Sequence, residues 1–336
     1  MAAFRVLVLK CLATCGLAVM VSSAHGEGNR PPSPDWTRYA YGEALIMGRD
    51  NQAFERTLVT DIGGVENFLS AQSPQYPFGG GFRTFYGALG PDCRGWEVGY
   101  FGLYNLTAAA RTSAAAVGTP LYMPGALGFA IDPVGADLAT VSTRTTINSA
   151  EANVFHHFER WNDRRDAWME IDWLTGFRYV NVEDAATIGL VCCNGTEFPS
   201  YDAGTSNNMF GGQVGGRARW NWNRWAIETW GKAGLLGNFQ SQYQGTILDE
   251  NGALVRDARS STGTTAGMIA DINLTAIYRL TDTWGIRAGY NVIWLGGIAQ
   301  ALNQFDFSAA STAGTLLQPS GSVFLQGANL GLEARW

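Results

Sequence analysis

The sequence predicts an all-β protein: a transmembrane, antiparallel, up-and-down β-barrel of about ten strands, with twelve as the alternative count, long extracellular loops and short periplasmic turns. Three observations predict it. Alternating apolar and polar stretches recur along the chain, the connections between them alternate long and short, and tryptophans gather at the short connections. Outer-membrane barrels combine these features, because lipid-facing and lumen-facing residues alternate along each strand. A secreted soluble β-protein is the alternative, but it has no reason to gather tryptophan at one end of each hairpin.

The composition narrows the function classes. The chain has 336 residues, of which 46% are hydrophobic and 15% charged, with 42 glycines and 12 tryptophans. Beyond the N-terminal segment there is no run of about 18 apolar residues, which excludes membrane-spanning helices. The net charge of -6 argues against a nucleic-acid partner.

The N-terminal segment predicts export. Arg5 and Lys10 precede an apolar stretch at 11–21, and small residues then lead to a cleavage position near Ala24. We therefore expect a signal peptide at 1–24, an extended proline-containing leader at 25–35, and an outer-membrane β-barrel at 36–336. The expected location is the outer membrane of a bacterial cell.

The last stretch, 322–336, shows the alternation most clearly. Leu330 and Trp336 fall on an apolar face, whereas Glu333 and Arg335 fall on the opposite face. This pattern is typical of a strand with one side toward lipid. We expect this strand to pair with the first one and close the barrel.

The same alternation predicts nine earlier strands, at 36–47, 82–88, 96–106, 147–159, 168–182, 209–220, 225–235, 268–280 and 284–295. The first has the least regular pattern, because Glu43 shares the phase of Tyr39 and Tyr41. The segments 107–146 and 183–206 are predicted to be loops, since they contain small residues, prolines or no sustained apolar face.

Tryptophans at the predicted periplasmic turns and chain ends form an expected aromatic girdle, the belt that marks a membrane–water interface. Its members are Trp36, Trp96, Trp161, Trp168, Trp220, Trp225, Trp284 and Trp336.

Charged residues on the inward phase are expected to line the lumen. They are Arg83, Glu97, Glu151, Glu170, Asp172, Arg178, Arg217, Arg219, Glu228, Lys232, Asp271, Arg279, Arg287, Glu333 and Arg335. With Glu159 they balance in sign, and buried charges persist when paired. A ten-stranded barrel is only slightly wider than one that side chains fill. This favours a salt-bridged, largely plugged lumen over a narrow water-filled channel, and predicts weak ion selectivity if a channel exists.

Several strand sequences carry a family resemblance. They are CRGWEVGYFGL at 93–103, EIDWLTGFRYVNVED at 170–184, SNNMFGGQVGGRARW at 206–220, RAGYNVIWL at 287–295 and the terminal QGANLGLEARW. Taken in order, they resemble the family of outer-membrane β-barrel porins, the planctomycete-type bacterial barrel proteins. The resemblance implies an outer-membrane barrel and a pore, and it brings no catalytic or substrate-binding residues with it. The aromatic C-terminus also resembles the signal by which bacterial barrels are recognised for assembly.

The expected function is therefore that of a porin for passive passage of small solutes. The alternative is a plugged structural or surface-interaction barrel. A barrel-embedded hydrolase is a third reading, in which His157 would meet Glu159 or Glu170, but no motif places a nucleophile. We thus predict no enzyme activity, no metal and no cofactor. The expected partners are outer-membrane lipid and, through the C-terminal strand, the barrel assembly machinery; the solute is not identified.

The cysteines of the exported chain test the topology. Cys93 is predicted at the periplasmic rim, and Cys192 and Cys193 outside the cell. A membrane thickness of about 30 Å would then separate them, far beyond disulfide reach.

Overall fold

The computed structural model describes residues 36–336 apart from 132–133, 162–166, 193–195, 198–199 and 250. The predicted signal peptide and leader lie outside the described residues. No helix in the described part of the chain is both long and apolar enough to span a membrane.

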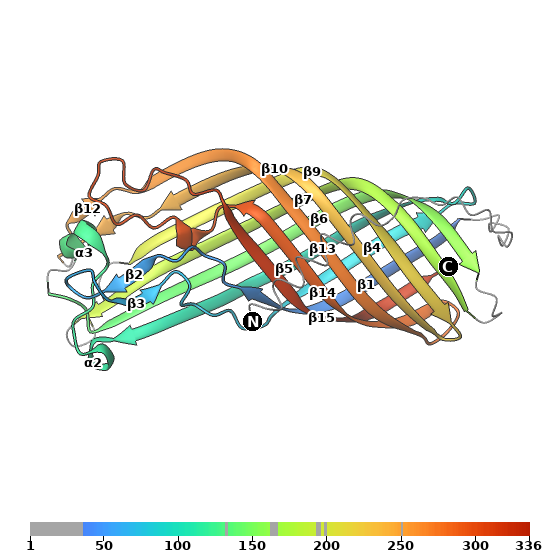
Figure 1. Cartoon of the computed structure of the whole chain (residues 1–336), viewed down its shortest axis with the longest axis horizontal. Coiled ribbons are helices and arrows are strands. Elements are labelled where there is room, and N and C mark those ends of the chain that lie inside the picture. Colours follow the sequence, from blue (N-terminus) through green and yellow to red (C-terminus); the bar gives the residue numbers. More distant parts are fainter. Residues whose placement is uncertain (1–35, 132–133, 162–166, 193–195, 198–199, 250) are drawn as a thin grey trace. The chain divides into compact units, whose positions relative to one another are not determined.

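Ten long strands form a closed antiparallel ring (Figure 1), in which each strand pairs with its neighbour in the chain. They are β1 (Thr37–Asp50), β4 (Gly79–Leu89), β5 (Arg94–Ser113), β6 (Leu138–Trp161), β7 (Ala167–Cys192), β9 (Tyr201–Trp222), β10 (Trp225–Gln244), β13 (Arg259–Arg279), β14 (Trp284–Ile298) and β15 (Gly321–Arg335). The predicted fold class, an up-and-down β-barrel of ten strands, is confirmed.

The first and last strands close the ring, as predicted. Tyr39 lies opposite Arg335, and the register continues to Asp50 opposite Phe324. Alternate residues of β1 are buried from Tyr41 onward, so the strand is regular and Glu43 belongs to its interior face. The sequence pattern looked irregular only because a carboxylate shares this face with aromatic and aliphatic residues.

The connections differ at the two ends of the ring. At one end, tight turns join β4 to β5, β9 to β10 and β13 to β14. The start of β1 and the end of β15 lie at this same end, which we call the short-turn end. The opposite, long-loop end carries the connections 51–78, 114–137, 193–200, 245–258 and 299–320. They contain β2 (Thr57–Thr60), β3 (Asn67–Ser70), α2 (Ala114–Val117), α3 (Gly125–Ile131), β8 (Thr196–Glu197), β11 (Ile247–Leu248), β12 (Leu254–Arg256) and η2 (Ala301–Asn303).

Several strands continue far beyond the predicted boundaries. β6 has 24 residues and β7 has 26, although about 9–11 residues cross a bilayer. The expected loops at 107–146 and 183–206 are therefore wrong in large part, because they contain the long-loop ends of β5, β6, β7 and β9. Small and polar residues suffice for a β-ladder where the outer face meets water, so these extensions lack an apolar stripe.

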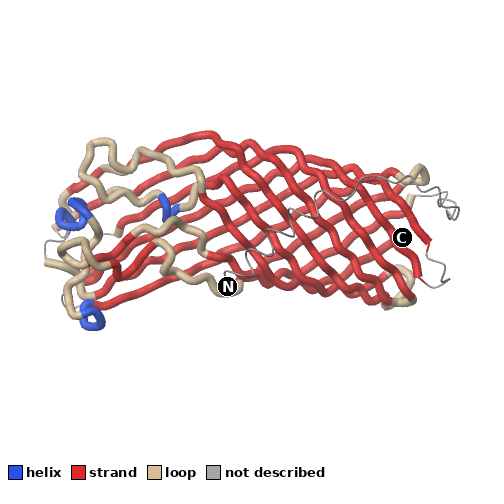
Figure 2. The backbone as a smooth tube through the Cα atoms, viewed as in Figure 1, coloured by secondary structure: helices blue, strands red, loops and turns tan. Residues whose placement is uncertain are grey.

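The barrel wall has unequal height. β1, β4, β14 and β15 have 14, 11, 15 and 15 residues, whereas β5, β6, β7, β9, β10 and β13 have 20 to 26. In Figure 1 the red strands β14 and β15 stop well short of the end that the green strands reach. Loops occupy this low side of the wall (Figure 2).

The outer face of the wall is apolar. Val98, Val154, Leu235, Leu274 and Leu330 are 45–70% exposed there. Their strand neighbours in sequence point to the interior, as the period of two requires. This is the surface that a bilayer covers in a transmembrane barrel.

The interior is filled by three successive layers from the short-turn end to the long-loop end. The first is a charged layer, described below. The second, the apolar layer, receives side chains from every ring strand except β4: Leu45, Met47, Phe101, Leu103, Leu106, Ile147, Val180, Val182, Met209, Leu236, Ile269, Ile293, Leu295, Ile298, Val323 and Leu325. The third is the cap, in which connections 51–78, 114–137 and 299–320 pack a hydrophobic core against the strand extensions through residues such as Leu58, Met123, Ile188, Tyr201 and Phe305.

Candidate functional site

The structure places the predicted inward charges on the interior face of the ring. Eleven are buried, namely Arg83, Glu97, Glu151, Asp172, Arg178, Arg219, Glu228, Lys232, Asp271, Arg287 and Glu333. The other four, Glu170, Arg217, Arg279 and Arg335, have intermediate exposure. Together with Glu43 these residues define the charged layer.

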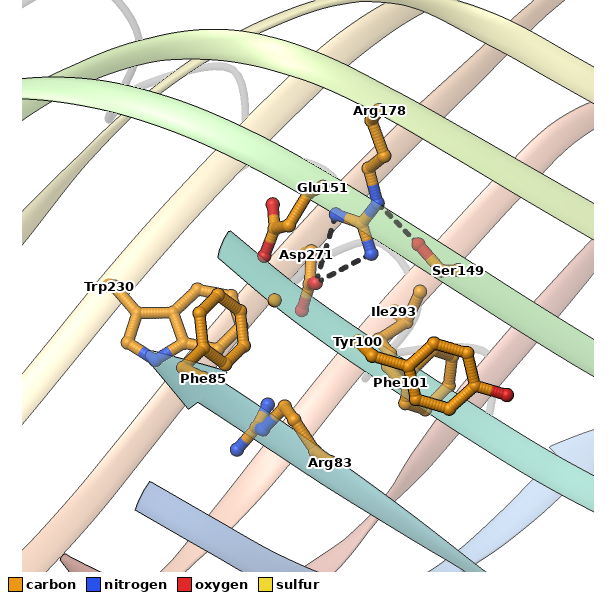
Figure 3. A pocket seen from close by; sticks show the side chains of 11 residues that line it. Arg83, Phe85, Tyr100, Phe101, Ser149, Glu151, Arg178, Trp230, Asp271 and Ile293 are labelled. Carbon is orange, nitrogen blue, oxygen red and sulfur yellow. Dashed lines mark hydrogen bonds and ion pairs between the residues drawn. The ribbon is translucent and has the colours of Figure 1, made fainter. Parts of the chain in front are cut away.

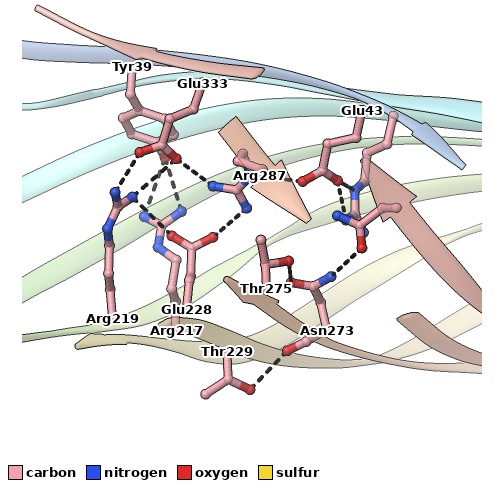
Figure 4. Close-up of polar contacts among 12 residues, drawn as sticks. Tyr39, Glu43, Arg217, Arg219, Glu228, Thr229, Asn273, Thr275, Arg287 and Glu333 are labelled. Atoms are coloured by element: carbon pink, nitrogen blue, oxygen red, sulfur yellow. Dashed lines mark hydrogen bonds and ion pairs between the residues drawn. The ribbon is translucent and has the colours of Figure 1, made fainter. Parts of the chain in front are cut away.

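Glu43 is the member that the sequence did not reveal. Its carboxylate accepts Arg83 Nε at 2.9 Å. It also accepts Arg287 Nε at 2.8 Å (Figure 4). Its shared phase with Tyr39 and Tyr41 was the available signal. The positive partners come from β4 and β14, so Glu43 links strands on both sides of the barrel seam.

Arg287 is the most heavily paired cation of the layer. It donates to Glu333 at 2.6 Å and to Glu228 at 2.7 Å, in addition to Glu43. Arg219 donates to the other oxygen of Glu333 at 2.5 Å. These contacts join β1, β9, β10, β14 and β15 into one network (Figure 4).

A second network crosses the interior. Lys232 on β10 lies 2.7 Å from Glu151 and 3.3 Å from Glu97. Arg217 on β9 donates to Glu97 at 3.0 Å and to Asp172 at 2.6 Å. β10 is adjacent to neither β5 nor β6 in the ring, and β9 is not adjacent to β5. The two Lys232 pairs and the Arg217–Glu97 pair therefore span the lumen, whereas Asp172 lies directly opposite Arg217 on the neighbouring strand β7.

One small cavity lies within the charged layer. A pocket bounded by Arg83, Trp230 and Asp271 has a volume of about 10 Å³ (Figure 3). That volume is about enough for one water molecule. On its far side Arg178 donates to Asp271 at 3.2 Å.

Buried amides complete the interior and were not predicted. Gln213 donates to Asn153 at 2.6 Å, and Asn291 donates to Asn329 at 2.9 Å. Each sits on the inward phase of its strand, which is a signal that a search restricted to charges misses.

A further buried ion pair holds the cap in place. Asp184 on β7 accepts Arg49 at 3.0 Å and Thr145 at 2.6 Å through one oxygen. Its other oxygen accepts the backbone N–H of Ala301, in the β14–β15 connection, at 3.0 Å. Arg49 also donates to Tyr76, in the β1–β4 connection, at 2.7 Å. One ion pair thus ties two cap connections to the wall.

The predicted girdle tryptophans separate into three groups. Trp36, Trp96, Trp220, Trp225, Trp284 and Trp336 are 39–54% exposed at the short-turn end. The side chain of Trp161 lies outside the described residues. Trp168 must be removed from the girdle: its Nε1 donates to Glu170 at 3.1 Å, and Arg279 lies over its ring. One residue separates Trp168 from Glu170 in β7, so both side chains lie on the same, inward face.

His157 pairs with Asp172, and its Nδ1 lies 2.6 Å from Asp172 Oδ1. The side chain of Glu159, one of its two expected partners, is outside the described residues. Cys93 has a free thiol in the β4–β5 turn at the short-turn end, and Cys192 ends β7 at the long-loop end; Cys193 lies outside the described residues. Where the structure describes the chain, no cluster of three or more His, Cys, Asp or Glu residues could hold a metal.

A closed ring of ten antiparallel strands, apolar outside and charged within, defines a transmembrane β-barrel of the outer-membrane class. The family described as "Putative beta barrel porin-7 (BBP7)" matches residues 134–336, and the chain belongs to this family. The family resemblance carried by the strand sequences is thereby confirmed.

No curated protein matches the chain in sequence. Among solved structures, the outer membrane protease OmpT from Escherichia coli is similar at 9% identity and TM-score 0.47, covering 90% of this chain and 98% of that one. A major outer membrane protein from Thermus thermophilus is similar at 12% identity and TM-score 0.34, covering 89% and 99%. Neisserial surface protein A is similar at 10% identity and TM-score 0.26, covering 88% and 96%. At these values the likenesses carry no functional argument.

Proposed function

We propose that this protein is a closed outer-membrane barrel, which presents its cap at the cell surface and does not form an open pore at rest. The observation that carries the proposal is the apolar layer. Its side chains come from nearly the whole ring and are each at most 6% exposed. Passive porins need a continuous aqueous path, and a packed apolar constriction excludes water.

The charged layer supports the same proposal. Arg287, Arg217 and Lys232 each contact at least two carboxylates across or along the lumen. A solute would have to separate these pairs, and leaving a buried charge without its partner costs about 3–5 kcal/mol. Passive passage of small solutes, the first expectation from the sequence, is therefore the less supported function.

The orientation follows from the same architecture. The exposed tryptophans at the short-turn end form a girdle at the periplasmic interface, and the long-loop end with its cap faces outward. In this proposal the N-terminal segment directs export, outer-membrane lipid covers the apolar wall, and the assembly machinery reads the terminal strand that ends at Trp336.

Single-channel recording tests the proposal. Purified protein inserted into planar phosphatidylcholine bilayers should give no stepwise openings at moderate voltage. Insertion is checked separately in liposomes, where bromine-labelled lipid should quench fluorescence from the tryptophans of the outer wall. A known open porin, prepared in the same detergent, is the positive control. Regular openings of the folded, inserted protein would refute the closed barrel.

A further inference from the structure

A pocket of about 430 Å³ lies where the connections 51–78, 114–137 and 299–320 meet. This volume falls in the range of about 300–1,000 Å³ that is typical of small-molecule sites. Pro124, Phe307 and Leu316 supply apolar lining, and Arg56 supplies a cation.

Arg56 is held in one orientation. Its Nη1 donates to the backbone oxygens of Asn303, at 3.2 Å, and of Phe305. Among the described residues its Nε and its other Nη have no hydrogen-bond partner. A guanidinium fixed from one side, with N–H groups still available on the other, is suited to bind a carboxylate or phosphate.

Asp306 is the other charged residue of the pocket lining, and its carboxylate is already engaged. One oxygen accepts the backbone N–H of Ser308 at 3.0 Å, and the other accepts that of Gly314 at 3.0 Å. The buried Arg256 donates to the Asp306 backbone oxygen at 2.9 Å. Both carboxylate oxygens of Asp306 are thus bonded within their own connection, and Arg56 supplies the one cationic side chain of the pocket lining.

The pocket lies close to the expected membrane surface. The low-side strands β1, β4, β14 and β15 have 11 to 15 residues, which is little more than a bilayer crossing requires. Loops that follow directly from their ends are expected to meet the outer leaflet. Leu316, which lines the pocket, is 69% exposed, so the pocket offers apolar surface at that level.

We propose that this pocket binds an amphipathic anion, with its acyl or other apolar chain against Phe307 and Leu316 and its carboxylate or phosphate on Arg56. The proposal goes beyond the closed barrel and does not require passage through it. Ala301, Leu302 and Phe305, which belong to the cap core beneath the pocket, are at most 1% exposed. A ligand would therefore be held at the surface and would not enter the lumen.

Binding of oleate to the full barrel in phosphatidylcholine nanodiscs, followed by native mass spectrometry and calorimetry, tests the site. The intact protein should bind one oleate saturably, and Arg56→Gln should weaken binding at least about tenfold. Arg144→Gln, a change on the outer wall of β6, is the matched control and should have no effect. Oleyl alcohol, which lacks the charge, should bind all three proteins alike.

A second variant covers the case in which Arg56→Gln misfolds. Leu316 is highly exposed, so Leu316→Asp leaves the fold intact and places a carboxylate beside the chain of the ligand. It should also weaken oleate binding at least about tenfold. Saturable binding that is the same in the intact protein and in folded Arg56→Gln or Leu316→Asp, or an absence of saturable binding, would overturn the proposal.

The source of the anion is distinguished by adding phosphatidylglycerol to the nanodiscs. If the outer leaflet supplies the ligand, this lipid will compete with oleate and remain bound to the intact protein in the mass spectrometer, but not to Arg56→Gln. If the ligand arrives from solution, adding phosphatidylglycerol will leave the affinity of the protein for oleate unchanged. Either result supports the site, and single-channel recordings on the same preparation bear only on the closed barrel.

Discussion

Replacing Glu43 by alanine should destabilise the barrel by about 3–5 kcal/mol, the cost of breaking one buried ion pair by removing one partner. Glu43 is 3% exposed and accepts both Arg83 and Arg287. The two arginines would lose different shares of their ion pairs. Arg287 retains Glu228 and Glu333, whereas Arg83 keeps a hydrogen bond to Asn291 at 2.7 Å and no carboxylate within ion-pair distance among the described residues. The loss of stability should therefore be close to the cost of leaving one buried guanidinium, that of Arg83, without an ion-pair partner.

The assay is urea unfolding in detergent micelles, followed by gel mobility and tryptophan fluorescence. Glu183→Ala is the control, since Glu183 is exposed on the outer face of β7, and a surface change of this kind is worth at most about 0.5 kcal/mol. The double variant Glu43→Met with Arg83→Met should recover most of the loss, because an apolar pair can replace a buried ion pair at little cost. A Glu43→Ala variant within about 0.5 kcal/mol of the intact protein, or a double variant that recovers nothing, would refute the reasoning.

Three further outcomes are expected. Leu330→Arg, at a 60% exposed position of the outer wall, should cost about 2–4 kcal/mol in lipid-reconstituted unfolding; no loss would mean that the position lies away from the bilayer centre. Asp184→Ala should speed protease cleavage in the cap connections while the ring strands stay resistant, and equal cleavage rates would exclude its proposed role of holding the cap. Burial alone would raise the pKa of Asp306, but the backbone N–H groups of Ser308 and Gly314 lower it below its ordinary value. Cap stability measured by the same proteolysis should thus be greatest above the ordinary carboxyl pKa and fall as the pH drops through the lowered one, and Asp306→Asn should flatten this dependence.

The ring was predictable because each strand has one face toward lipid and the other toward the packed interior. Lipid outside and packed charges inside impose a strict alternation, so the phases of Leu330, Glu97 and Arg287 could be assigned from the sequence. The pairing of the first and last strands was predictable because a barrel of consecutive antiparallel strands closes only when these two pair. The interior position of Glu43 was not predicted. In the sequence of a lipid-facing strand, a carboxylate on the interior face looks the same as a break in the alternation.

The cap and the strand extensions could not be predicted in the same way. Outside the bilayer a strand needs no apolar stripe, so Ala108 and the small residues around it resembled a loop. The cap core joins segments far apart in the chain, such as Leu58, Met123 and Phe305. Contacts of this kind depend on how the whole ring closes, and no local period encodes them.

The pairing of β1 with β15 also constrains how the molecule is made. Residue Arg38 exchanges two backbone hydrogen bonds with the last residue, Trp336, at 2.7 and 3.0 Å. The first strand therefore keeps one unpaired edge until the last strand is available to pair with it. Closing a loop of this length costs about 5 kcal/mol of chain entropy, and an edge exposed for that time is open to pairing with other chains. Joining the two ends by a short linker and opening the chain at another tight turn would not remove this step. It would move the seam to the opened turn, because the two strands on either side of the new ends would then have to close the ring.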